Sequence, residues 1–396
     1  MPDFPFGTTI TFSSILLATY IFFKFSAIKK RSSPSRVTKS SSSSSFLDKS
    51  KVKATEKVQP VDASFDWKTE EPVKQYPFKN AAYKLTMGIK NLSVQDWLLI
   101  DSDYLRKLKA KKEIVTNDHP FYPKEKQLTD RTVLITEECW PAARELYDVV
   151  IQYLCDKYPM YFVVDSVKGT VHNKITDETH PYTADSVPLE DTKELLFKLS
   201  RNIEEDFIIL LKDPSRESEK DGSEYFYKGG VFAFAAGFAP SDRFNMPLSF
   251  IHHPIPGYES KLKLSMNRFF DRVSPGQYVS RMNFSVQTHD RFYVDDQNKN
   301  HNLKEGEETV VFKKEDLDFD NQVHYRSERQ TLTKLPKSGA VVFTIRTFLV
   351  PMSQLKQEGP EVTERFIGAI KGLPEDIADY KRSVAWGPAV IDYLEQ

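Results

Sequence analysis

The stretch YRSERQTLTKLPKSGAVVFTIRTFL, residues 325–349, contains the two strands on which the prediction of the fold depends. Its second half is apolar and typical of a buried strand, but Arg346 lies in the middle of it. Alternation along a strand places Arg346 on a largely apolar face. Because arginine is rarely fully buried without a partner, its guanidinium is predicted to face either a structural ion pair or an anionic ligand.

Other arginines occupy comparable strand positions. The same alternation places Arg326 on one side of the first strand and Arg329 on the opposite side, and Arg281 lies in a third strand, YVSRMNFSV. Three strands that each present an arginine could form a bidentate site for carboxylates or phosphates. The alternative is a structural network in which acidic residues such as Glu328 and Glu205 pair with the arginines, and spacing alone favours this alternative.

The composition limits the functional class. The chain has 396 residues, a formal net charge of −1, 28% charged residues and 40% hydrophobic residues. This near-neutral balance argues against non-specific binding of nucleic acid. The two cysteines, Cys139 and Cys155, favour a reducing compartment and are too few for a four-thiolate iron–sulfur cluster. The sequence also lacks a Walker loop, a Rossmann glycine motif and a G-x-S-x-G motif.

The N-terminal region differs from the rest of the chain. Residues 8–28 are mostly apolar and carry no charge apart from Lys24, and Lys29, Lys30 and Arg31 follow them. A segment of this length can cross ~30 Å of hydrocarbon, so a single transmembrane helix is predicted. A cleaved signal peptide is the alternative, but its charges normally precede the apolar core. The charges after the helix predict a C-terminal domain in the cytosol, on the endoplasmic reticulum or the outer mitochondrial membrane.

The remaining sequence divides into a linker and one domain. Residues 29–63 are rich in serine and lysine and predict a flexible, disordered linker. Residues 64–396 contain no further linker and predict a single α+β domain. Within this domain, residues 137–157 have the apolar spacing of an amphipathic helix, and FIILL at 207–211 is typical of a buried strand.

A histidine pair is a second candidate site. SFIHHPIPGY, residues 249–258, contains His252 and His253. In a strand, adjacent side chains point in opposite directions, so the two histidines are not expected to share one metal ion. One of them could be the single axial ligand of a haem iron. The alternative, which the residues alone favour, is a histidine hydrogen-bonded in a loop.

A carboxylate at the start of a strand is a third candidate. In NIEEDFIILLKD, residues 202–213, Glu205 leads directly into the apolar run. A carboxylate in such a position could act as an acid or a hydrogen-bond acceptor in a pocket. The alternative is a solvated helix end.

Several segments together resemble one family. They are LTMGIKNLSVQDWLLIDSDY (85–104), IEEDFIILL (203–211), IHHPIPGY (251–258), SRMNFSV (280–286) and YRSERQTLTKLPKSGAVVFTIRTFLVPM (325–352). With these segments the chain resembles the alpha-subunit-like family of haem-dependent oxidative N-demethylases, whose fungal members are called HRQ family proteins. The resemblance covers nearly all of residues 76–394 in collinear order, and RSERQTLTKLPKSGA is its most specific part.

The resemblance implies a PAS-like antiparallel sheet with additional helices that binds haem b. His252, in the family pattern I-H-x-P-[VI]-P-G-Y, is then the predicted ligand of the haem iron, whereas His253 falls at a variable position. Glu205 matches an acidic residue of the family and is the candidate catalytic residue of the distal pocket. The candidates for holding the haem propionates or shaping the pocket are Arg281, Arg326, Arg329 and Arg346.

The activity that the resemblance implies is oxidation of an N-methyl group of a small amine by dioxygen, with release of formaldehyde. The chain contains no recognisable flavin or iron–sulfur module, so the electrons would come from a separate flavin or iron–sulfur reductase as redox partner. Phe284 stands where bacterial members often have tryptophan, which leaves the substrate open. Two other functions also stay open: a haem-binding sensor or carrier without turnover, and a haem-less interaction protein of the same fold.

Overall fold

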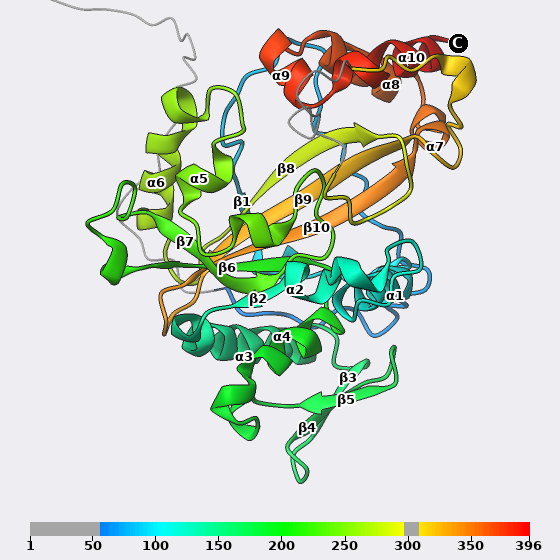
Figure 1. Ribbon diagram of the computed structural model, residues 1–396. Coiled ribbons are helices and arrows are strands. Elements are labelled where there is room, and N and C mark those ends of the chain that lie inside the picture. Colours follow the sequence, from blue (N-terminus) through cyan, green and yellow to red (C-terminus); the bar gives the residue numbers. More distant parts are fainter. Residues whose placement is uncertain (1–55, 297–308) are drawn as a thin grey trace, which may run out of the picture. The chain divides into compact units, whose positions relative to one another are not determined.

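The computed structural model describes residues 56–296 and 309–396, which belong to one structural unit, Lys53–Gln396. The centre of this unit is a seven-stranded sheet in which neighbouring strands are antiparallel (Figure 1). In spatial order its strands are β1 (Lys90–Leu92), β8 (Tyr278–Gln287), β9 (His324–Lys334), β10 (Val341–Pro351), β6 (Asp206–Lys212), β7 (Tyr225–Val231) and β2 (Val133–Ile135).

The stretch at 325–349 forms the hairpin β9–β10, which confirms the prediction of two strands. The strands pair in register from Val341 opposite Lys334 to Pro351 opposite His324. Between them, Gly339 has a φ of 68°, a left-handed conformation that glycine adopts without the steric cost of a side chain. The hairpin is flanked by β8 on one side and β6 on the other, so both of its strands are internal to the sheet.

Helices cover both faces of the large sheet, as Figure 1 shows. On one side lie α1 and the pair α3 and α4, and on the other lie α5, α6 and the C-terminal helices. A second, three-stranded antiparallel sheet contains β3 (Phe162–Asp165), β4 (Thr170–Asn173) and β5 (Glu178–Pro181). The helices are α1 (Tyr104–Val115), α2 (Leu128–Thr132), α3 (Trp140–Lys157), α4 (Thr192–Ser200), α5 (Leu248–His252), α6 (Lys263–Arg272), α7 (Met352–Gln357), α8 (Pro360–Lys371), α9 (Glu375–Tyr380) and α10 (Ser383–Glu395).

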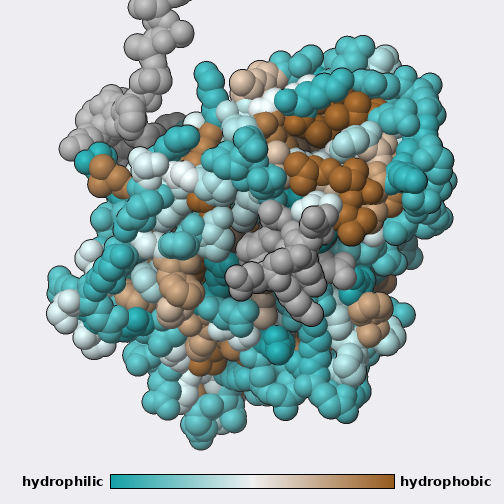
Figure 2. Space-filling model, turned by 45° about the horizontal axis from the view of Figure 1, so that its top comes forward, coloured by the Kyte–Doolittle hydropathy of each residue, from teal (hydrophilic) through white to brown (hydrophobic). Residues whose placement is uncertain are grey.

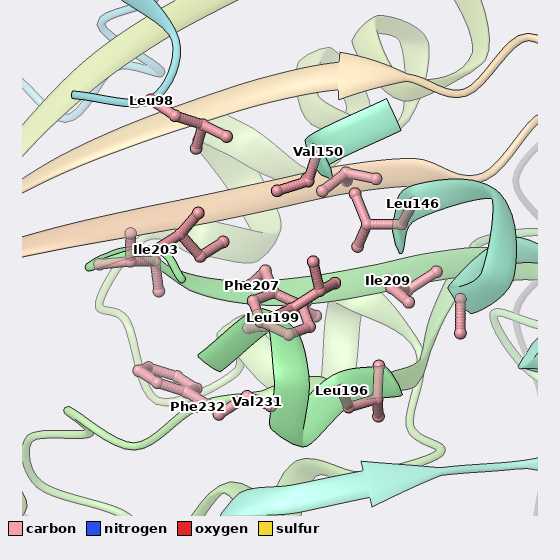
Figure 3. Packing of buried hydrophobic residues seen from close by; sticks show 14 of the residues in the cluster. Leu98, Leu146, Val150, Leu196, Leu199, Ile203, Phe207, Ile209, Val231 and Phe232 are labelled. Carbon is pink, nitrogen blue, oxygen red and sulfur yellow. The ribbon is translucent and has the colours of Figure 1, made fainter. Parts of the chain in front are cut away.

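The main core lies between the sheet and helices α3 and α4. Leu146 and Val150 of α3 point toward Phe207 and Ile209 of β6, and Leu199 of α4 lies beside them (Figure 3). Each of these side chains is almost completely buried. Burial of a side chain of this size stabilises the fold by roughly 1.5–3 kcal/mol. The predicted amphipathic helix over 137–157 is therefore confirmed, because its apolar stripe is the face that packs on the sheet.

A second core cluster joins the C-terminal helices to the far end of the sheet. Phe78, Phe366 and Trp386 are buried in it, together with Tyr325 of β9. Figure 2 shows a mostly hydrophilic surface on which hydrophobic residues gather toward the side of the C-terminal helices. This cluster connects the C-terminal helices to β9, the strand that carries Arg326 and Arg329.

The predicted transmembrane helix, residues 8–28, lies outside the described residues. Within residues 56–296 and 309–396, no helix is both long enough and apolar enough to span a bilayer. The longest of them, α3, has 18 residues and includes Arg144, Glu145 and Asp148. The fold is therefore α+β with antiparallel sheets. This finding corrects two predictions: that the fold includes a transmembrane helix, and that the protein is located in a membrane as a single-pass protein.

The predicted linker, residues 29–63, is described only from residue 56 onward. In that part, Val58 and Val61 pack against the main core. The Val61 backbone N–H donates to the carbonyl of Lys157, at the end of α3, over 2.9 Å. The last residues of the linker thus contact the domain, and the boundaries at 28 and 63 stay predictions.

Candidate functional site

The two faces of the large sheet separate the predicted arginines into two groups. Arg281 of β8 lies opposite Gln330 of β9, which lies opposite Ile345 of β10, so these three residues share one face. Arg329 lies opposite Arg346, so this pair shares the other face. The alternation that the sequence predicted for these strands is therefore confirmed.

Arg346 lies within a buried ionic network, behind the sheet as seen from Arg281. Its guanidinium donates to Glu205 Oε1 over 3.1 Å, to Glu204 Oε1 over 2.7 Å and to the carboxylate of Asp101. Burial alone would lower the pKa of Arg346, but the three carboxylates together raise it. Arg346 and Glu205 therefore belong to a structural ion-pair network, which was one of the two alternatives for these residues.

Two lysines of α1 complete the network. Lys107 Nζ lies 2.9 Å from Glu204 Oε2, and Lys111 Nζ lies 3.3 Å from Asp206 Oδ1. Lys111 also donates to the carbonyls of Glu204 and Glu205, each over 2.7 Å. Burial raises the pKa values of Glu204 and Asp206, and the nearby cations partly oppose this rise. Glu205, the predicted catalytic acid, is thus bound to Arg346 and does not line the cavity described below.

Arg329 and Arg326 are also paired with the protein itself. Arg329 donates to the carbonyls of Asp96 and Trp97 on the network side of the sheet. Arg326, on the other face, donates to Glu328 Oε1 over 3.2 Å and to the carbonyl of Phe292 over 3.3 Å. Neither side chain lines the cavity, so Arg281 and His252 are the predicted site residues that line it.

A cavity of about 260 Å³ lies on the Arg281 face of the sheet. Its walls come from strands β6–β10, from α5, α6 and α9, and from the segments 83–89 and 232–238. The apolar wall residues are Leu85, Met87, Ile89, Ile208, Leu210, Phe232, Ala236, Phe238, Leu248, Ile251, Ile255, Leu262, Met266, Phe270, Leu332, Phe343, Ile345 and Ile377. Many of the polar wall residues belong to β8 and β9.

His252 lines this cavity from the end of α5. This segment is not a strand: residues Leu248–His252 form a short helix that follows Pro247. The ring nitrogen Nδ1 lies 2.8 Å from the carbonyl oxygen of Leu248, which can only accept, so Nδ1 carries the hydrogen and Nε2 carries the lone pair. The Tyr258 ring stacks on the imidazole at 5.2 Å with an interplanar angle of 16°. His253, in contrast, is exposed.

The electrostatics of the cavity keep His252 neutral. Burial lowers the pKa of His252 to about 4, and the positive charges of Arg281 and Arg243 act in the same direction. A neutral imidazole with a free Nε2 lone pair is the form that binds a metal. Within residues 56–296 and 309–396, no group of three or more His, Cys, Asp or Glu side chains could hold a metal ion by itself.

Arg281 is half-buried and lines the cavity. Its Nε is buried, and no described residue accepts a hydrogen bond from this atom. Burial is also the main cause that lowers the pKa of Arg281. A buried N–H group without an acceptor is costly, so this position suits an anionic ligand that accepts a hydrogen bond from Nε.

The sequence reasoning missed two cations that also line the cavity, Arg243 and Lys381. Arg243 donates to the carbonyl of Ile251, and Lys381 donates to the carbonyl of Phe284 over 2.6 Å. Of the described residues that line the cavity, three are cationic, Arg281, Arg243 and Lys381, and one is a carboxylate, Glu328. Arg243 and Lys381 lie in segments whose spacing indicates no strand, and only their positive charge could have marked them.

Gln330 adds an acceptor at the same end of the cavity. Its Nε2 donates to Glu328 Oε2 over 3.0 Å, whereas its Oε1 is buried without a hydrogen-bond partner among the described residues. Among the described residues, the cavity therefore offers an imidazole nitrogen, three cationic side chains and an amide oxygen without a hydrogen-bond partner. Such a set suits an amphipathic, anionic ligand that also presents a metal ion.

A comparison with known families gives an independent result. A family model described as "Haem-dependent oxidative N-demethylase, alpha subunit-like" matches residues 88–391. The match includes β8, β9 and β10, helix α5 with His252, and every wall of the cavity except part of segment 83–89. Because the match covers well over half of the chain, this protein belongs to the alpha-subunit-like family of haem-dependent oxidative N-demethylases.

Proposed function

We propose that this chain binds haem b in the cavity and oxidises an N-methyl group of a small amine. The observation that carries the proposal is the meeting of His252 and Arg281 in one cavity. The first offers a neutral imidazole whose Nε2 is not used, and the second offers a buried Nε–H group that has no acceptor among the described residues. The family to which the chain belongs is haem-dependent, which supports the same cofactor.

The residues present fit a haem in three respects. His252 would bind the iron through Nε2, because Nδ1 is already fixed by the carbonyl of Leu248. Arg281, with Arg243 and Lys381, would hold the two propionates, because guanidinium and ammonium groups donate strong hydrogen bonds to carboxylates. The apolar wall of α5, α6 and β6 would contact the hydrocarbon edges of the ring.

Haem binding would require the cavity to widen. Its volume of about 260 Å³ lies below the range of ~300–1,000 Å³ found for small-molecule sites. Met87 and Met266 lie in its wall. Their unbranched side chains can change rotamer at low cost and enlarge the space.

The proposed reaction is a demethylation in which dioxygen is the oxidant. When bound, the haem supplies the activation of dioxygen. One oxygen atom ends in formaldehyde, the other in water, and the amine keeps its nitrogen with a hydrogen in place of the methyl group. Two electrons come from the C–H bond that is oxidised, and two electrons with two protons come from outside. A separate flavin or iron–sulfur reductase is the proposed donor.

The protein's own groups would shape the reaction space. The apolar walls exclude water, which strengthens every charge interaction inside the cavity. The free Oε1 of Gln330 can accept a hydrogen bond from an N–H group of the substrate. Arg326 and Asn283 hold Glu328 from both sides, over 3.2 and 3.3 Å, and so fix the acceptor end of the cavity.

The test of the proposal is a hemin titration of the purified full-length protein, read by absorbance. The wild-type protein is expected to bind one haem per chain, and His252→Ala is expected to lose that spectrum. The matched control is His253→Ala, because His253 is the neighbouring, exposed histidine and should leave the spectrum unchanged. A His252→Ala protein with an unchanged haem spectrum would contradict the assignment of the ligand.

A second measurement separates an enzyme from a haem sensor or carrier. The haem-loaded protein, with a generic electron donor and dioxygen, is expected to release formaldehyde from at least one amine of a methylamine panel. Stable haem without formaldehyde across the panel would favour a sensor or carrier. A folded protein that takes up no haem would favour an interaction protein.

A further inference from the structure

One peptide unit connects His252 to a buried carboxylate on the far side of α5. The carbonyl of Leu248 accepts the Nδ1–H of His252 over 2.8 Å. The N–H of the same peptide unit belongs to Ser249 and donates to Glu224 Oε2 over 2.7 Å. The two hydrogen bonds therefore lie at the two ends of one amide group, so that a single chain runs from carboxylate to imidazole.

Glu224 is well placed to hold this chain rigidly. It lies directly before β7 and its side chain is 4% exposed, and Ser249 is 6% exposed. Glu224 Oε1 also accepts from Ser249 Oγ over 2.6 Å and from Asn267 Nδ2 of α6 over 2.7 Å. The carboxylate thus joins β7, α5 and α6 at the point from which His252 enters the cavity.

No step of the proposed reaction uses Glu224. Glu224 does not line the cavity itself, and its link to His252 runs through the Leu248–Ser249 peptide. A purely structural anchor would need only the bonds from Ser249 Oγ and Asn267. The additional bond to a backbone N–H, whose own carbonyl holds the cavity histidine, is what points to a role beyond anchoring.

We propose that Glu224 is a positioning residue for His252, which acts through the Leu248–Ser249 peptide and increases electron donation from Nε2 to a bound metal. This inference rests on the proposed function in so far as the metal is the iron of a haem. A carboxylate at the N–H end polarises the peptide, so its carbonyl oxygen becomes a stronger acceptor. A stronger bond to Nδ1–H fixes the tautomer and makes Nε2 a better donor.

The test compares Glu224→Gln with Ser249→Ala in the full-length protein. Glu224→Gln keeps the shape but removes the charge from the end of the peptide. Ser249→Ala removes a hydrogen bond to the same carboxylate but keeps the backbone N–H that carries the proposed relay. Glu259→Gln serves as a control for the loss of a carboxylate, because Glu259 is exposed and forms an ion pair with Lys263 on the surface.

Two readouts are needed, and one of them does not require haem. In the haem-free protein, ¹⁵N shifts of the His252 ring report the tautomer and the strength of the Nδ1–H bond. In the haem-loaded protein, the iron–histidine stretching frequency and the hemin dissociation constant report donation from Nε2. For Glu224→Gln we expect a weaker Nδ1–H bond, a lower stretching frequency and a roughly 10–100-fold weaker haem affinity. Ser249→Ala and Glu259→Gln should keep the wild-type tautomer and stretching frequency.

Equal changes in Glu224→Gln and Ser249→Ala would overturn the proposal, since they would assign Glu224 a structural role only. An unchanged ¹⁵N spectrum in Glu224→Gln would overturn it as well. If Glu224→Gln does not fold, Glu224→Asp retains the charge at a longer distance, and a shift of the Nδ1 resonance in the same direction is then the expected result. A wild-type protein that binds no haem would count against the proposed function, whereas the ¹⁵N readout would still decide on the relay.

Discussion

Arg346 offers the sharpest test of how the two faces of the sheet divide their tasks. The proposed change is Arg346→Leu, which keeps an apolar side chain on β10 but removes the guanidinium that binds Asp101, Glu204 and Glu205. All three carboxylates are almost fully buried. Lys107 and Lys111 would remain as the cations of the network.

The magnitude follows from the charge left without a partner. Removal of one partner from a buried ion pair typically costs ~3–5 kcal/mol of the free energy of unfolding, because the remaining charge stays desolvated. We expect a loss in this range at pH 7.5, measured by urea denaturation. The control, Arg268→Leu, changes an exposed arginine of α6 and should stay within about 0.5 kcal/mol of the wild type.

The pH dependence of the same loss has a definite sign. Burial raises the folded-state pKa of Glu204, and Arg346 is the strongest charge that opposes the rise. Without Arg346 the folded protein binds a proton at Glu204 more readily than the unfolded chain does. Stability then increases as the pH falls through the raised pKa, so the difference from wild type should shrink in acid.

Two results would refute this reasoning. One is a loss of less than about 1 kcal/mol, which is typical of exposed ion pairs. The other is a loss that grows as the pH is lowered. The haem spectrum of the folded variant is expected to match the wild type, because Arg346 lies on the face opposite the cavity. A loss of haem from a stable Arg346→Leu protein would instead support the sequence prediction that Arg346 holds a propionate.

Three further predictions concern the cavity and the sheet. Arg281→Ala should weaken hemin binding by roughly 10–150-fold in a titration, which corresponds to the loss of a charged hydrogen bond of ~1.5–3 kcal/mol. The control is Arg272→Ala, which changes an exposed arginine and should bind hemin as the wild type does. Equal affinities of the two variants would contradict the role of Arg281. Haem retention, followed by absorbance, should be constant from pH 8 to 5 and fall near pH 4. The reason is that a proton competes with the metal for His252, whose pKa is about 4. A loss of haem already at pH 6.5 would count against His252 as the ligand. Gly230→Ala should lower the free energy of unfolding by well over ~1 kcal/mol. Gly230 has a φ of 143°, and a Cβ there would meet the carbonyl oxygen of Phe207 at 2.1 Å. The control, Gly387→Ala, should be tolerated, because the nearest contact of its Cβ would be at 3.5 Å.

Much of the fold could be predicted from local patterns. The apolar period of residues 137–157 gave helix α3, and the alternation in 325–349 gave two strands with Arg326 and Arg329 on opposite sides. In contrast, residues 258–262 form a π-helical turn directly before helix α6, and apolar spacing does not reveal such a turn. Such patterns depend on near neighbours only, which is why they could be predicted from one sequence.

The partners of the arginines could not be predicted in this way. Arg346 meets Asp101, which lies far away in the sequence, and Lys107 and Lys111 reach the network from a helix near the start of the domain. Spacing within β10 shows that Arg346 shares a face with Thr344 and Phe348, but it does not show what covers that face. The order of strands in the sheet decides this, and that order is a non-local property.

The separation of the two faces explains why the chain can keep so many buried charges. On the network face, three cations from two elements meet four carboxylates, so nearly every charge has an opposite charge within reach. On the cavity face, Arg281 has no acceptor for its Nε among the described residues. A buried N–H group without an acceptor costs free energy. The proposed ligand, an anion bound beside the neutral imidazole of His252, would supply that acceptor, whereas the ion pairs of the network face need no ligand.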